Sequence, residues 1–249
     1  MNILITSVGR RSYLVTYFRD ALRKASVQGE IHVSNSSPIS PAFRLADKTV
    51  VTPIVYSDDY IPFLLEYCQV NNIDAVISLF DVDLPVLAKN RRKFEEINDT
   101  HLKYESAVSS QRVVIQEYIE GEEYGLDVIN DLEGNYRTTI VKRKYGMQSG
   151  ETDCAKIVEA PDIVEISKKI ACQFRHYGNL DVDVIKKDSK FIVIDMNARF
   201  GGGYPFSHIA GVDLPLAIVM WLQGAEVKDD ILKAENDVFA QKDISIIKY

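Results

Sequence analysis

The sequence predicts an α/β protein in two parts, a doubly wound N-terminal domain followed by an α+β domain. Three observations support this prediction. Short apolar strands alternate with amphipathic helices over the first hundred residues, which is typical of an open parallel sheet. After Asn98 the pattern changes to a polar, serine-rich and aperiodic stretch. Beyond that stretch, strand-like segments flank turn signals, which indicates antiparallel strands.

The N-terminal domain is predicted from its apolar runs. Residues 2–6 form a strand, and a glycine-containing turn leads into a helix over residues 13–24, whose apolar side chains recur at helical spacing. Further strands and helices are expected at residues 30–37, 48–53, 57–68, 73–79 and 83–97. The near-continuous apolar run of residues 73–79 is typical of a buried parallel strand. Ligands of such sheets bind at the carboxyl ends of the strands.

The second part of the chain is predicted to contain antiparallel strands and one long helix. Strand-like segments cover residues 113–119 and 123–144, a helix begins at Pro161, and a hairpin covers residues 178–197. We therefore divide the chain into a domain over residues 1–98, a linker over residues 99–112 and a domain over residues 113–249.

Composition narrows the class of protein. The chain is 46% apolar and has a net charge of −7, with scattered Lys and Arg, so a nucleic-acid partner is disfavoured. Its apolar runs are shorter than the roughly 20 residues that span a bilayer, and no basic region precedes the first apolar stretch. Three cysteines without CxxC spacing fit a reducing compartment. We expect a cytoplasmic protein without a membrane anchor.

Acidic side chains alternate along the hairpin of residues 178–197. Alternation places Asp181 and Asp183 on one face of the first strand, and Phe191, Val193, Asp195 and Asn197 on one face of the second. A turn over residues 187–189 would put Asp181 directly across from Asp195, with Cβ atoms roughly 5 Å apart.

Two such carboxylates repel each other unless a cation lies between them, and Mg²⁺ prefers oxygen ligands of this kind. The hairpin therefore predicts a magnesium site with Asp181, Asp195 and Asn197 as ligands. The alternative is a solvated polar end of a hairpin.

Arg199 and three glycines follow the second strand of this hairpin. Arg199 continues the alternation, and its planar guanidinium suits a phosphate or a carboxylate better than a lysine would. Gly201, Gly202 and Gly203 allow the backbone to approach a ligand closely. A phosphate-binding end of the hairpin is therefore expected.

A family resemblance becomes specific in residues 192–215, which read IVIDMNARFGGGYPFSHIAGVDLP. This segment resembles the C-terminal metal-binding motif of the ATP-grasp superfamily, which includes the carbamoyl-phosphate synthase large chain and related ATP-dependent ligases. Residues 113–128, VVIQEYIEGEEYGLDV, resemble the adenine-binding strand and hinge of that family. The resemblance implies that Glu117 faces the adenine amino group, the backbone of Ile119 binds the ring and Glu123 holds the ribose. The alternative for both glutamates is an ordinary exposed hairpin.

Two further segments are assigned by the resemblance. Residues 140–158 are similar to the family segment near the phosphates, which makes Lys142, Arg143 and Gln148 candidates for contacting phosphate or substrate; the alternative is a charged, solvated strand. The first domain resembles the preATP-grasp domain. There, Asp81 and Asp83 follow a predicted strand and are candidates to orient a substrate, with a helix cap as the alternative role.

The lid expected of this family is missing from the sequence. ATP-grasp proteins carry a small mobile subdomain whose lysine and glycine-rich loop close over the nucleotide phosphates. Residues 99–110 contain no glycine and only one lysine, and they are too few for such a subdomain. We expect either a natural chain without a lid or a sequence from which a mobile segment has been left out, and we favour the second.

The resemblance implies an ATP-dependent ligase that activates a small carboxylate as an acyl phosphate and joins it to an amine. ATP and Mg²⁺ are the implied cofactors, with Mn²⁺ as an alternative ion, and a homodimer is one option for the oligomeric state. A second hypothesis is a nucleotide-binding protein of the same fold that no longer catalyses because it has no lid. A dehydrogenase is disfavoured, because SVGRRS has one glycine where a dinucleotide fingerprint needs three.

Overall fold

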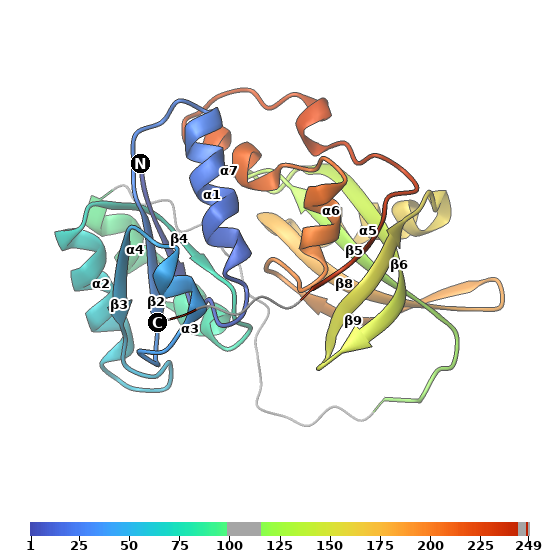
Figure 1. Ribbon diagram of the computed structural model, residues 1–249, viewed down its shortest axis with the longest axis horizontal. Coiled ribbons are helices and arrows are strands. Elements are labelled where there is room, and N and C mark those ends of the chain that lie inside the picture. Colours follow the sequence, from blue (N-terminus) through green and yellow to red (C-terminus); the bar gives the residue numbers. More distant parts are fainter. Residues whose placement is uncertain (99–115, 244–247, 249) are drawn as a thin grey trace. The chain divides into compact units, whose positions relative to one another are not determined.

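The computed structural model describes residues 1–98, 116–243 and 248, which form two compact units (Figure 1). The first unit is the N-terminal part of the chain with Leu222–Ala225, and the second contains most of the remainder. The linker predicted over residues 99–112 lies outside the described residues, so the predicted domain boundaries stay a prediction. Within the described part of the chain, no helix is long and apolar enough to cross a membrane.

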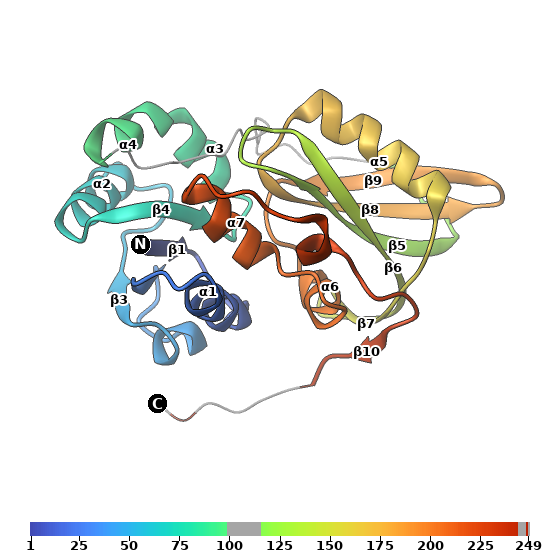
Figure 2. The ribbon, with the colours of Figure 1, turned by 90° about the horizontal axis from the view of Figure 1, so that it is seen from above.

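The first unit is a four-stranded parallel sheet in the order β3-β2-β1-β4. Its strands are β1 (Asn2–Thr6), β2 (Ile31–Asn35), β3 (Lys48–Val51) and β4 (Ile73–Ser78). Its helices are α1 (Tyr13–Lys24), η1 (Pro41–Arg44), α2 (Tyr60–Val70), α3 (Asp83–Lys89) and α4 (Arg91–Asn98). One apolar core joins residues of β1 and β4 to α2, α3 and α4, and Figure 2 shows α1 on the other face of the sheet. The predicted doubly wound fold is confirmed.

One helix of the first unit differs from its prediction. A single helix was expected over residues 83–97, but α3 ends at Lys89 and α4 begins at Arg91. The side-chain amide of Asn90 donates to the carbonyl oxygen of Val86 at 2.9 Å. Asparagine competes in this way with the backbone hydrogen bonds of a helix, which is why the helix breaks at this residue.

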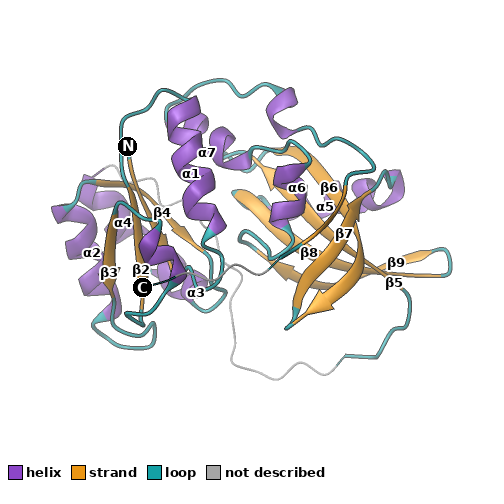
Figure 3. Ribbon diagram, in the orientation of Figure 1, coloured by secondary structure: helices purple, strands orange, loops and turns teal. Residues whose placement is uncertain are grey.

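The second unit is a six-stranded antiparallel sheet in the order β10-β7-β6-β5-β8-β9 (Figure 3). The strands are β5 (Glu122–Asn130), β6 (Tyr136–Gln148), β7 (Glu151–Ile157), β8 (Gly178–Lys187), β9 (Lys190–Asn197) and β10 (Phe239–Gln241). The helices are α5 (Pro161–Phe174), α6 (Tyr204–Ile209), α7 (Leu214–Leu222) and η2 (Asp229–Leu232). The α+β class predicted for this part of the chain is confirmed.

The two faces of this sheet differ in character because side chains alternate along each strand. On one face, Leu126, Val128 and Val182 pack with Ile163 and Ala171 of α5 in an apolar core. The opposite face carries charged and amide side chains of the same strands. We call this opposite face the polar face.

The hairpin of β8 and β9 has a different register from the one predicted. Lys187 pairs with Lys190, so the turn consists of Asp188 and Ser189, and Asp188 has a left-handed φ of 55°. Two-residue turns with Asp in this conformation are favoured in hairpins. The placement of Asp181 across from Asp195 is therefore wrong. Asp181 lies opposite Asn197.

A bulge in β9 also changes which of its side chains share a face. Asp183 pairs with Asp195 and Val184 with Val193, which leaves Ile194 as the extra residue. The prediction that Val193 shares a face with Asp195 is wrong for the same reason. Phe191 and Val193 pack against the apolar core, whereas Asp195 and Asn197 lie beyond the bulge on the polar face.

The segment before β5 differs from its prediction as a strand. Residues 116–121 form no strand, and the predicted residues 113–115 lie outside the described part of the chain. The side chain of Gln116 donates to the carbonyl oxygen of Ile194 at 3.2 Å. Gly121 runs so close to the backbone of Lys186 that an added Cβ would overlap it. Contacts to β8 and β9 therefore replace strand pairing in this segment.

Candidate functional site

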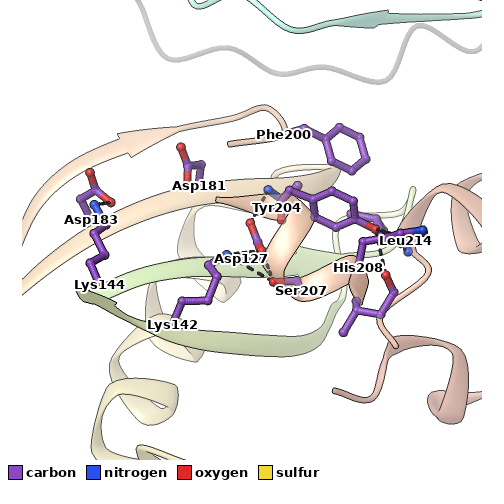
Figure 4. Close-up of polar contacts among 12 residues, drawn as sticks. Asp127, Lys142, Lys144, Asp181, Asp183, Phe200, Tyr204, Ser207, His208 and Leu214 are labelled. Atoms are coloured by element: carbon purple, nitrogen blue, oxygen red, sulfur yellow. Dashed lines mark hydrogen bonds and ion pairs between the residues drawn. The ribbon is translucent and has the colours of Figure 1, made fainter. Parts of the chain in front are cut away.

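Charged side chains of three neighbouring strands meet on the polar face of the second unit (Figure 4). In register, Asp127 of β5 lies opposite Asp181 of β8, and Gly125 lies between Asp183 of β8 and Lys142 of β6. Lys144 Nζ and Asp183 Oδ1 are 2.7 Å apart, and Lys142 forms a buried ion pair with Asp127.

Gly125 makes room for the two lysines. A Cβ at this position would lie 3.1 Å from Cε of Lys144 and 3.8 Å from Cε of Lys142. Lys144 therefore crosses β5 above a residue without a side chain to reach Asp183 of β8, and Lys142 passes beside the same residue to reach Asp127 of β5.

Arg199 lies after β9 and is 8% exposed. Its Nη1 donates to Oδ2 of Asp181 at 2.9 Å. Burial raises the pKa of Asp181 to about 6, and the positive charge of Arg199 opposes that rise. Gly201 packs directly on this carboxylate, because an added Cβ would lie within 2.5 Å of all three of its atoms.

The three predicted magnesium ligands lie on adjacent strands of the polar face. Nδ2 of Asn197 donates to Oδ2 of Asp195 at 2.7 Å, and Asp181 lies directly across from Asn197. Two carboxylates and an amide carbonyl are hard oxygen donors, so their chemistry fits Mg²⁺. Among the described residues, no three His, Cys, Asp or Glu side chains are grouped to hold a metal ion, so the ligand roles stay a prediction.

The residues predicted to hold the nucleoside lie around one cavity. Glu117, Ile119 and Glu123 line a cavity of about 260 Å³ together with Ile185 and Ile194. The apolar wall of this cavity is formed by isoleucines of three segments, and its three glutamates, Glu117, Glu120 and Glu123, are exposed.

A neighbouring cavity of about 350 Å³ shares Glu123 and is also lined by Arg143 and Lys144. Arg143 forms an ion pair with Glu122. Gln148 is exposed at the end of β6, where it pairs with Glu151 of β7. The structure therefore groups Arg143 with the nucleoside candidates and leaves Gln148 apart from both cavities.

Lys142 is placed differently from the solvated lysine that the strand pattern allows. It is 1% exposed, and Nζ contacts Asp127 and also lies 3.3 Å from Oγ of Ser207. Lys144, which the sequence reasoning missed, lines the 350 Å³ cavity instead. The sequence contains a signal for Lys144, because it lies two residues after Lys142 in a predicted strand and is therefore expected on the same face.

Asp83 of the first unit is a buried carboxylate rather than a helix cap. It accepts hydrogen bonds from Thr6 Oγ1 at 3.0 Å, Tyr60 OH at 3.2 Å and Ser78 Oγ at 3.3 Å. Burial raises its pKa in spite of these donors. The hydroxyl groups of Thr6 and Ser78 thus hold Asp83 at the carboxyl ends of β1 and β4. Asp81, the other candidate, is half-buried two residues earlier.

Family comparisons identify both units. Residues 3–102 match the family model described as "PylC-like, N-terminal domain". Residues 109–243, more than half of the chain, match the model described as "ATP-grasp in the biosynthetic pathway with Ter operon". The chain belongs to this ATP-grasp family. The resemblance found in residues 113–128 and 192–215 is confirmed, and the polar face belongs to the ATP-grasp domain.

Solved ATP-grasp structures share the fold. N5-carboxyaminoimidazole synthetase from Staphylococcus aureus is 12% identical, with a TM-score of 0.61 over 92% of this chain and 78% of that one. Biotin carboxylase from Campylobacter jejuni, in a β-γ-ATP complex, is 13% identical, with a TM-score of 0.63 over 94% and 73%. The phosphoribosylaminoimidazole carboxylase ATPase subunit from Aquifex aeolicus is 14% identical, with a TM-score of 0.60 over 90% and 76%. At these identities the likeness concerns the fold.

Proposed function

We propose that this ATP-grasp chain binds Mg·ATP on the polar face of the second unit and uses it to join a small carboxylate to an amine. One observation supports this assignment above all. Oxygen donors and basic side chains gather on the polar face, and the nucleoside candidates line a cavity a few residues further along β8. Asp183 faces Lys144, and Ile185, two residues further along the strand, lines that cavity.

The 260 Å³ cavity fits a nucleoside in its chemistry. Ile119, Ile185 and Ile194 provide apolar walls, as expected of a slot for a planar ring. The carboxylates of Glu117 and Glu123 can accept hydrogen bonds from amino and hydroxyl groups. The Campylobacter jejuni neighbour was solved as a β-γ-ATP complex, which supports a nucleotide as the ligand of this chain.

Asp181, Asp195 and Asn197 would hold the Mg²⁺ ion. Held there, the ion would supply positive charge against the negative charge that develops during phosphoryl transfer; Mn²⁺ is the alternative ion. Arg199 would bind a phosphoryl oxygen with its planar guanidinium, which is held in place by Asp181. Arg143 and Lys144 supply further positive charge at the 350 Å³ cavity.

The proposed reaction has two steps. A carboxylate oxygen of the first substrate attacks the γ-phosphorus of ATP, the bond to ADP breaks, and an acyl phosphate forms. The amine nitrogen then attacks the acyl carbon, loses a proton and expels inorganic phosphate. Exclusion of water protects the acyl phosphate between the two steps.

A nucleotide-binding protein without turnover is the second candidate. It is favoured by the short connection between the two units, because residues 99–115 are too few to form a lid subdomain. Without a lid, the nucleotide loses part of its phosphate contacts and its protection from water.

Two measurements separate the candidates. Isothermal titration with ATP, with and without Mg²⁺, tests binding, and release of ADP and phosphate with a panel of small carboxylates and amines tests turnover. Turnover that requires both a carboxylate and an amine supports the ligase. Magnesium-dependent binding without turnover supports the second candidate, and a protein that binds no Mg·ATP refutes both.

A further inference from the structure

The buried carboxylate of Asp127 gathers donors from three other elements of the second unit (Figure 4). Oδ2 accepts from Lys142 of β6 and, at 2.5 Å, from Oγ of Ser207 of α6. Oδ1 accepts from Nδ2 of Asn179 of β8 at 3.0 Å. Buried ion pairs can often be replaced by apolar side chains without loss of stability, so folding alone does not account for this arrangement.

Asn179 connects Asp127 to the proposed phosphate-binding arginine. Its Nδ2 also donates to the backbone carbonyl oxygen of Arg199 at 3.2 Å. The guanidinium of Arg199 in turn donates to Asp181 at 2.9 Å and to the carbonyl oxygen of Phe200 at 3.3 Å. Three hydrogen bonds thus run in series from Asp127 to Asp181.

The glycine segment after Arg199 packs on both ends of this series. Gly201 lies against the carboxylate of Asp181, as described above. A Cβ at Gly203 would lie 3.4 Å from Cε of Lys142, the ion-pair partner of Asp127. A displacement of the Asp127 carboxylate would therefore also displace the backbone of Arg199 and the glycines that follow it.

We propose that Asp127 is a positioning residue of this site: through Asn179 it fixes the backbone of Arg199 and so orients the Arg199–Asp181 pair toward bound Mg·ATP. This inference rests on the proposed function. Asp127 is fully buried and acts through Asn179 rather than on the ligand. Removing an outer hydrogen-bond partner of a metal site typically weakens metal affinity or activity 10–100-fold.

The test removes the side chain of Asn179, and the same substitution at a second buried asparagine serves as the control. Asn179→Ala removes the bridge and leaves Asp127 with Lys142 and Ser207. Asn130→Ala is the control: Asn130 is equally buried, and its Nδ2 donates to the carbonyl oxygens of Gly134 and Ala171, away from Arg199. The readouts are the Kd of Mg·ATP by titration calorimetry and the ¹⁵N NMR signal of the Arg199 guanidinium without nucleotide.

We expect Asn179→Ala to raise the Kd of Mg·ATP about 10–100-fold and to shift the Arg199 signal. Asn130→Ala should leave both within the error of the wild type. The double variant Asp127→Leu/Lys142→Met removes both charges together, so that neither is left buried alone, and it also removes the acceptor of Asn179 Nδ2, so it should behave like Asn179→Ala. It also serves as the test variant if Asn179→Ala does not fold.

Two results would overturn the inference. One is an equal Kd for the Asn179 and Asn130 variants in a protein whose wild type binds Mg·ATP. The other is an unchanged Arg199 signal in Asn179→Ala, which counts against the inference even if the wild type binds no nucleotide. Absence of binding by the wild type refutes the proposed function separately.

Discussion

Gly201→Ala should destabilise the second unit because the space beside Gly201 is already filled by the carboxylate of Asp181. The new Cβ would lie within 2.5 Å of all three carboxylate atoms, about 1 Å closer than atoms pack in a protein core. Asp181 must therefore move, which breaks its 2.9 Å hydrogen bond to Arg199. A hydrogen bond to a charged group contributes about 1.5–3 kcal/mol, and overpacking costs about 1–3 kcal/mol.

We therefore expect a loss of about 3 kcal/mol in the free energy of unfolding of the second unit. Gly203→Ala is the matched control, because its Cβ would make an ordinary 3.4 Å contact and its φ of −82° suits alanine. Urea unfolding followed by the fluorescence of Trp221, the single tryptophan of the chain, reports on this unit. If both variants unfold at the same urea concentration, the proposed packing of Asp181 on Gly201 is incorrect.

Three further predictions use other parts of the chain. Asp195→Asn should raise the Kd of Mg·ATP at least tenfold in calorimetry, while the same change at the exposed Asp188 of the same hairpin should not; equal effects would argue against the metal site. Burial lowers the pKa of His176 to about 4, so on acidification the unfolded chain takes up a proton at this residue before the folded protein does. The wild type should therefore lose about 3 kcal/mol of its free energy of unfolding, relative to His176→Gln, as the pH falls from 6.5 to 4. A thiol reagent should modify the exposed Cys172 in the native protein but reach Cys68 only after unfolding, because burial raises the pKa of Cys68 to about 12; rapid native labelling of Cys68 would contradict its placement in the core.

The strands of both units could be predicted because their apolar patterns are local properties of the sequence. Residues 73–79 form a near-continuous apolar run, and β4 is a parallel strand that is buried except at Asp74, as expected. The grouping of the acidic side chains of β8 on one face also follows from alternation alone. The break at Asn90 was missed, because its side chain competes with the helix only once the helix has formed.

The hairpin register could not be predicted because two- and three-residue turns both fit the sequence around Asp188. A bulge has no simple sequence signal, so the change of face at Ile194 was invisible as well. Asp127 was missed for a different reason. Its side-chain partners lie 15, 52 and 80 residues away in the sequence, and only the folded sheet brings them together.

The bulge at Ile194 makes the length of β9 as important as its composition. Deletion of Ile194 would remove the residue that has no partner and would leave Asp195 opposite Asp183, so Asp195 and Asn197 would stay on the polar face. Deletion of a paired residue such as Met196 would instead turn Asn197 toward the apolar layer against α5. Relatives of this chain that are one residue shorter in β9 should therefore lack the residue at position 194 rather than one of its paired neighbours.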